Sequence, residues 1–111
     1  MEKRLGKIES VSFGLGGYQG AMLGLHVTLG DGSWGVGDSR ANWDAEMIDC
    51  TEYSKWSESD RDVWYAEIIR YVSKLLKDAK VDSVDKLKGK PVEVTFYGNT
   101  LKEWRILTEE L

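Results

Sequence analysis

Three residue types that often indicate the chemistry or the fold of a protein are scarce in this chain. Its 111 residues include one cysteine, one histidine and one proline. Because Cys50 is alone, no internal disulfide can form, and a reducing intracellular compartment is the simplest expectation. One histidine and one cysteine do not make up the usual zinc ligand sets. We therefore expect no metal dependence and no cofactor.

Long apolar runs and a surplus of basic charge are absent as well. No run approaches the roughly 18 residues of a membrane span, and residues 1–6 lack the hydrophobic stretch of a signal peptide. The expected location is cytoplasmic. The 15 basic and 19 acidic side chains give a net charge of -4, which argues against binding to duplex nucleic acid or to a membrane surface. With 41% hydrophobic residues, residues 1–111 read as a single globular domain.

The first part of the chain carries the pattern of β-strands. Residues 22–29 alternate between apolar and small or polar side chains, as in a half-buried strand. A second stretch, at about 5–13, is also rich in β-forming residues. Its apolar side chains lie on one sheet face only if a bulge near Glu9 or Ser10 shifts the alternation. Gly30-Asp31-Gly32 predicts a tight hairpin, and residues 33–38 are expected to form the next strand.

The second part begins with a helical pattern. Apolar residues recur at helical spacing over about 58–80, and a short second helix is expected between Asp82 and Gly89. Residues 92–96 and 101–107 read as two strands joined by a hairpin. The predicted fold is α+β, with an antiparallel sheet of about five strands covered by one long helix and a short second helix.

One helix covers only one face of such a sheet. The five tryptophans are more than a core of this size normally holds, so we expect some of them to line an interface or a pocket, although all of them could be core. We expect a second copy of the chain to cover the other sheet face, which makes the protein a homodimer or a higher homo-oligomer.

The residues usually needed for catalysis are sparse. His26 lies on a predicted strand among apolar residues, which favours a structural or surface role. Acidic neighbours Asp49 and Glu52 disfavour a reactive Cys50 thiolate. No carboxylate pair stands in a setting that predicts acid–base work. The sequence therefore predicts a protein that is not an enzyme.

A glycine cluster at residues 14–20 is the first candidate binding site. The amides of Gly16 and Gly17 can cradle phosphate oxygens, and Tyr18 and Gln19 offer a flat ring and an amide for a nucleobase or ribose. The cluster fits neither the phosphate-loop spacing nor the dinucleotide fingerprint. A plain flexible hairpin connection is the alternative.

The C-terminal hairpin is the second candidate. Asn99 either contacts a ligand edge or is merely the positive-φ residue of the turn. Arg105 can bind a phosphate in bidentate fashion, or it can form a salt bridge to Glu103 or the acidic loop. Arg105 is expected on the sheet face opposite Trp104.

These motifs together resemble a known group. Residues 13–19 with Ala21 and Met22, residues 34–37, residues 91–96, and residues 98–102 with Trp104 and Arg105 resemble a widespread family of small phage and prophage proteins. In its size and in the order of its predicted elements, the chain is similar to the anti-Thoeris sponge proteins. These proteins bind the cyclic ADP-ribose signal of bacterial TIR-domain proteins. The resemblance implies an anti-defence protein that sequesters a cyclic nucleotide, including cyclic oligonucleotides in some members, without catalysis.

A second hypothesis rests on the acidic and aromatic segment 43–56, which contains Trp43, Tyr53 and Trp56. Acidic residues interleaved with aromatic ones can fill a basic groove on another protein. In that case the chain would be a protein–protein inhibitor or interaction module.

Overall fold

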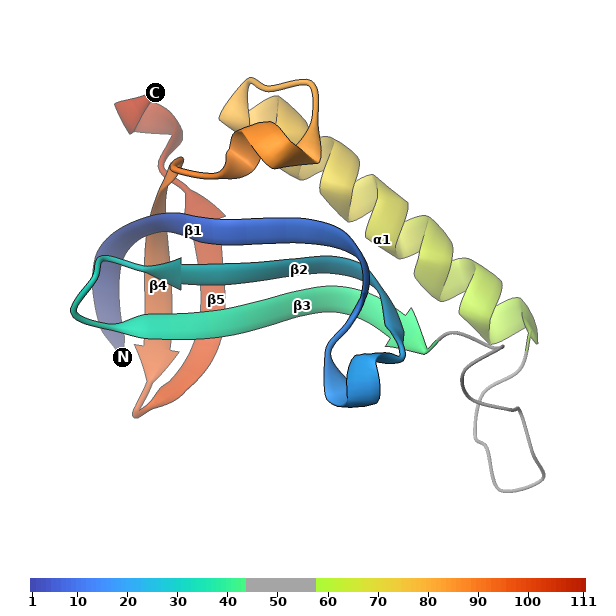
Figure 1. Ribbon diagram of the computed structural model, residues 1–111. Coiled ribbons are helices and arrows are strands. Elements are labelled where there is room, and N and C mark those ends of the chain that lie inside the picture. Colours follow the sequence, from blue (N-terminus) through green and yellow to red (C-terminus); the bar gives the residue numbers. More distant parts are fainter. Residues whose placement is uncertain (44–57) are drawn as a thin grey trace.

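The computed structural model describes residues 1–43 and 58–111, and these form one antiparallel sheet with one long helix (Figure 1). The strand order is β3-β2-β1-β4-β5. The α+β class and the five-stranded antiparallel sheet are confirmed. The elements are β1 (Glu2–Gly16), β2 (Met22–Gly30), β3 (Gly35–Trp43), α1 (Glu58–Ala79), β4 (Pro91–Tyr97) and β5 (Thr100–Ile106).

Strand β1 divides the sheet into two halves. Its first part pairs with β4 and its second part with β2, and Lys7 lies opposite both Pro91 and Gly30. The register shifts between Ile8 and Ser10, which confirms the predicted bulge. Bulges bend and twist a strand, and Figure 1 shows β4 and β5 running steeply across the direction of β2 and β3.

Close packing at the bend requires a glycine. A Cβ on Gly6 would lie 2.6 Å from the carbonyl oxygen of Gly30 and 2.9 Å from the ring of Trp34. Both distances are too short for a side chain, so only glycine lets β1 approach the end of β2 here. The Trp34 ring in turn meets Phe96 on β4 edge-to-face, with centroids 5.7 Å apart.

The core lies between the concave face of the sheet and α1. Helix residues such as Leu75 and Ala79 pack with apolar side chains from both halves of the sheet. The fully or nearly buried strand residues of this cluster are Ile8, Leu25, Val27, Leu29, Val92, Val94 and Ile106. The helix predicted over 58–80 is found at Glu58–Ala79. This helix is not long and apolar enough to cross a membrane.

The helix ends in a left-handed residue. Lys80 has φ +58°, its N–H donates to Lys77 O at 3.2 Å, and the Val81 N–H donates to Leu76 O at 3.0 Å. This pair of hydrogen bonds is the Schellman arrangement, which usually places glycine at the left-handed position.

The predicted second helix is wrong. Only a 3-10 turn of 4 residues, Val84–Leu87, forms there. Immediately afterwards the chain joins β1: the Gly89 N–H donates to Ile8 O at 2.7 Å, and Lys90 O accepts from the Ile8 N–H at 3.0 Å. Because this pairing begins so early, the connection has no length for an α-helix.

Where β1, β2 and β3 pair, the convex sheet face carries mostly small side chains, together with Met22, His26 and Trp43. Residues that lie directly opposite one another on β1, β2 and β3 share this face, as Ser12, His26 and Ser39 do. Trp34 and Trp104 instead pack against the core. Serine, threonine and glycine can face water, and the partner copy expected on this face stays a prediction.

Candidate functional site

The six residues nominated from the sequence lie in three separate places. Gly16, Gly17, Tyr18 and Gln19 lie at the connection from β1 to β2. Asn99 lies at the tip of the β4–β5 hairpin, and Arg105 lies near the far end of β5. That hairpin neighbours Glu2, at the opposite end of β1 from Gly16. Figure 1 shows the two turns well apart.

The glycine-rich connection is a 3-10 turn. The Gly20 N–H donates to Gly17 O at 3.1 Å, and Gln19 is exposed with φ +56°. The Tyr18 backbone belongs to this turn, whereas its side chain lies outside the described residues. Phosphate binding by this turn stays a prediction, beside the alternative of a plain hairpin connection.

The geometry of the C-terminal hairpin bears on the two roles predicted for Asn99, a ligand contact or the positive-φ residue of the turn. The positive φ of the turn, +64°, belongs to Gly98, and Asn99 is not among the residues with positive φ. Glycine at the first central position is typical of a type II′ turn. Asn99 is therefore not needed as the left-handed residue. Its exposed side chain borders a hollow of about 170 Å³ beside Arg4, Trp34 and Phe96.

Arg105 projects from the sheet face opposite Trp104 and is held by carboxylates. Its Nη2 donates to Glu109 Oε1 at 2.9 Å and its Nε to Glu93 Oε1 at 3.3 Å. The hydrogen bond that Arg105 donates to Glu109 raises the pKa of Arg105, and the same bond lowers the pKa of Glu109. The salt-bridge alternative is thus what the structure contains, with Glu93 and Glu109 as partners in place of Glu103.

A different cluster lies on the inner face of β3. Here β3 extends to Trp43, further than the predicted 33–38. Asp38, Arg40 and Asn42 lie opposite Val27, Leu25 and Leu23, and therefore on the core-facing side. Inward polar residues are a known way to protect an edge strand.

Each of these three side chains meets a different environment. Asp38 accepts a hydrogen bond from Trp104 Nε1 at 2.7 Å. The Arg40 guanidinium lies 4.7 Å from the ring centroid of Tyr71, a cation–π contact. Burial raises the pKa of Tyr71 above its ordinary value. Asn42 is 7% exposed and makes no hydrogen bond through its side chain to any described residue.

Arg40, Asn42 and Tyr71 line a cleft of about 310 Å³ between β3 and α1. The helix is anchored beside it, because Tyr65 Oη donates to the Trp43 carbonyl oxygen at 3.2 Å. Trp64 is 40% exposed, so its ring is available to a ligand. The side chains that matter for binding chemistry are Arg40, Asn42, Trp64, Glu67, Ile68 and Tyr71.

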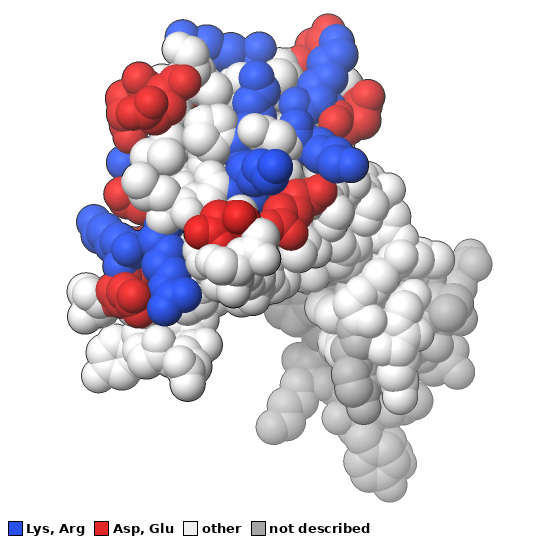
Figure 2. Space-filling view, turned by 60° about the vertical axis from the view of Figure 1, so that its left-hand side comes forward, with Lys and Arg blue, Asp and Glu red and all other residues white. Residues whose placement is uncertain are grey.

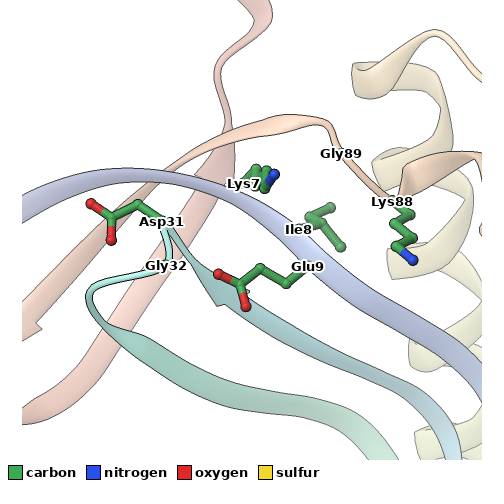
Figure 3. A pocket seen from close by; sticks show the side chains of 7 residues that line it. All are labelled: Lys7, Ile8, Glu9, Asp31, Gly32, Lys88 and Gly89. Carbon is green, nitrogen blue, oxygen red and sulfur yellow. The ribbon is translucent and has the colours of Figure 1, made fainter.

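Another hollow, of about 340 Å³, lies where β1 passes the β2–β3 turn (Figure 3). Its lining mixes Lys7, Glu9, Asp31 and Lys88. Figure 3 shows the charged groups of Glu9, Asp31 and Lys88 pointing in different directions. Among the described residues that line it there is no aromatic ring. This hollow therefore offers a ligand less than the β3–α1 cleft.

Charges on the surface are mixed. Figure 2 shows basic and acidic side chains interspersed on one face of the molecule, without an extended area of one sign. Within residues 1–43 and 58–111, no group of three His, Cys, Asp or Glu side chains is placed to hold a metal ion. Cys50 and nearly all of the acidic and aromatic segment 43–56 lie outside the described residues.

His26 has a structural setting on the convex face. Its Nε2 lies 3.2 Å from both Gly14 O and Met22 O, and its Nδ1 lies 2.8 Å from Ser39 Oγ. Since carbonyl oxygens only accept, Nε2 carries the proton, and Nδ1 accepts from the Ser39 hydroxyl in the neutral ring. The ring thereby links β1, β2 and β3.

No protein-family model matches this chain, and comparisons with curated proteins and with solved structures give no match either. The resemblance to the anti-Thoeris sponge proteins therefore stays a prediction. The cleft itself was not predicted. Beyond Val36, the inward positions of β3 carry the polar residues Asp38, Arg40 and Asn42, so the sequence shows no apolar alternation that would extend the strand.

Proposed function

We propose that this chain is a non-catalytic binding protein that holds a nucleotide-type ligand in the cleft between β3 and α1. The observation that carries the proposal is Asn42. Asn42 is 7% exposed, lines the cleft and makes no side-chain hydrogen bond to a described residue. Its carboxamide can therefore pair with a ligand without breaking a hydrogen bond of the fold.

The neighbouring side chains match the parts of a nucleotide. The Trp64 ring can stack on a base, and the Asn42 carboxamide can both donate to and accept from a base edge. Arg40, which is exposed and has no carboxylate partner among the described residues, can bind a phosphate in bidentate fashion. Glu67, on the helix side of the cleft, can accept from ribose hydroxyls.

Size and chemistry support binding rather than turnover. About 310 Å³ lies at the lower end of the range for small-molecule pockets. Among the described lining residues there is one carboxylate, Glu67, and no histidine or cysteine. We therefore propose sequestration, with a cyclic nucleotide signal of the cyclic ADP-ribose type as the specific ligand, because of the family resemblance. The action would be anti-defence in an infected bacterium.

A thermal-shift screen tests the proposal. The panel is cyclic ADP-ribose isomers, ADP-ribose, NAD and cyclic oligonucleotides, each followed by recovery of the ligand after heat denaturation. A ligand at a hundredfold excess over its dissociation constant stabilises the folded state by about 2.7 kcal/mol. Recovery of the ligand intact indicates binding without turnover, and no shift with any compound contradicts the proposal.

Variants decide which site binds. Arg40→Ala and Trp64→Leu are expected to weaken binding at least tenfold, while Arg70→Ala, at an exposed position of the same helix, leaves it unchanged. Asn99→Ala and Arg105→Ala address the sites nominated from the sequence. If these two weaken binding and the cleft variants do not, the ligand site lies at the C-terminal hairpin instead.

A further inference from the structure

The second part of β1 has an edge that no strand covers among the described residues. β4 pairs with β1 only over Glu2 to Lys7, and Gly89 and Lys90 extend the contact to Ile8. From residue 10 to residue 16, the only strand that pairs with β1 within residues 1–43 and 58–111 is β2.

This edge also exposes apolar side chains. Phe13 is 45% and Leu15 55% exposed, and both lie opposite residues of the core-facing side, Leu25 and Leu23. Residues 10–17 contain no charged side chain. A neutral, apolar strand edge is a template for pairing with another strand.

The two outer edges of the sheet are protected. β3 turns Asp38 and Arg40 inward, and β5 carries Lys102, Glu103 and Arg105. Charged side chains at such positions disfavour the addition of a strand. The unprotected edge is therefore the one in the middle of the sheet, on β1.

We propose that residues 10–16 of β1 pair antiparallel with the same residues of a second copy of this chain, about a twofold axis. A second copy fits because the segment is neutral and meets no charge of its own sign when it pairs with itself. With Phe13 opposite the partner's Phe13, Val11 lies opposite the partner's Leu15. Opposed residues share a sheet face, so the apolar row continues into the partner. Ser12 then lies opposite the partner's Gly14 on the convex face, where the glycine leaves room for the serine side chain.

The test is the oligomeric state of the full chain by sedimentation velocity, across a concentration series. The wild type is expected to dimerise, and Phe13→Lys and Leu15→Lys are each expected to weaken the dimer at least tenfold. Leu5→Lys is the matched control, because Leu5 is 63% exposed on the same strand but lies in the part paired with β4. A monomeric wild type, a dimer that both variants retain, or an equal loss with Leu5→Lys overturns the proposal.

Cross-linking decides the question if the lysine variants do not fold. In a Cys50→Ser background, Phe13→Cys is expected to form an intermolecular disulfide under mild oxidation. Directly opposed Cα atoms in antiparallel strands are about 4.5–5.5 Å apart, which suits a disulfide. Leu5→Cys in the same background is expected to stay largely uncross-linked. Equal cross-linking of both variants overturns the proposal. Nucleotide binding is a separate readout, so this proposal and the ligand proposal can fail independently.

Discussion

The indole Nε1 of Trp104 donates a hydrogen bond to Asp38 Oδ2 at 2.7 Å, and this bond joins β5 to β3, the two outer strands of the sheet. Strands at opposite ends of a flat five-stranded sheet could not be joined by two side chains. The bond is therefore a direct sign of the strong curvature that begins at the β1 bulge. It also fixes Asp38 beside the cleft formed by Arg40 and Asn42.

Removing the indole donor of Trp104 should destabilise the curved sheet, because the link between β5 and β3 is lost. Trp104→Phe leaves the partly buried Asp38 carboxylate without that hydrogen bond, and we expect the free energy of unfolding to fall by about 1–3 kcal/mol. Asp38→Asn retains an oxygen that can accept the bond and should cost less. Urea denaturation followed by circular dichroism measures both. An equal loss in the two variants would indicate that the packing or charge at these positions matters more than the bond.

The end of α1 offers a stabilising substitution. Lys80 adopts φ +58°, a conformation that costs a residue with a Cβ about 1 kcal/mol relative to glycine. Lys80→Gly should raise the free energy of unfolding by about that amount. As a control, Lys77→Gly, inside the last helical turn, should lower the free energy of unfolding by about 1 kcal/mol. A destabilised Lys80→Gly protein would mean that the lysine side chain contributes more than its backbone costs.

The β2–β3 turn should respond to acid. Asp31 accepts hydrogen bonds from the Ser33 hydroxyl at 2.7 Å and the Ser33 N–H at 2.9 Å, and these bonds lower the pKa of Asp31 below its ordinary value. A depressed folded-state pKa contributes stability that is present above the unfolded-state pKa and is lost as the pH falls through the folded one. The stability difference between wild type and Asp31→Ala should therefore shrink as the pH is lowered from 7 toward 2.

NMR titration of the Asp31 carboxyl checks the cause directly. Ser33→Ala removes the hydroxyl donor and should move the pKa of Asp31 back toward 3.8, the ordinary value. If the pKa stays where it is, the backbone donors alone determine it. A wild-type Asp31 that titrates above 3.8 would contradict the hydrogen-bond explanation.

The sequence predicts the elements of this fold better than their arrangement. The alternation around Leu25 and Val27, and the helical spacing from Ile68 to Leu75, are local patterns produced by burial on one face. The curvature depends on the bulge near Glu9 together with a change of partner at Lys7, and only the first of these leaves a local signal. Which strands pair depends on the whole chain, so the hydrogen bond between Trp104 and Asp38 could not be predicted from the sequence of β3 or of β5 alone.

The candidate site shows the same limit. Residues with obvious binding chemistry, such as Gln19, Asn99 and Arg105, were nominated from local sequence, yet the structure places them apart. The cleft combines β3 with α1, which are separated in the chain by residues 44–57. Its polar members Arg40 and Asn42 occupy positions where a strand normally carries core side chains, so the periodicity gave no reason to place them on an inner face.

Asn42 provides the sharpest separation of a binding role from a structural one. A buried amide that the fold needs would destabilise the protein when it is lost. An amide kept for a ligand, without a partner among the described residues, should not. Because leucine has a similar size and the Asn42 carboxamide makes no hydrogen bond to a described residue that would be lost, Asn42→Leu should be nearly neutral for the stability of the ligand-free protein. The same variant should lose at least tenfold in affinity for the nucleotide that binds the wild type. Chemical denaturation and calorimetric titration measure the two quantities. Asn99→Leu, at an exposed hairpin position, is the control and should alter neither. A large loss of stability in Asn42→Leu would instead assign the amide to the fold, and unchanged affinity would remove it from the site.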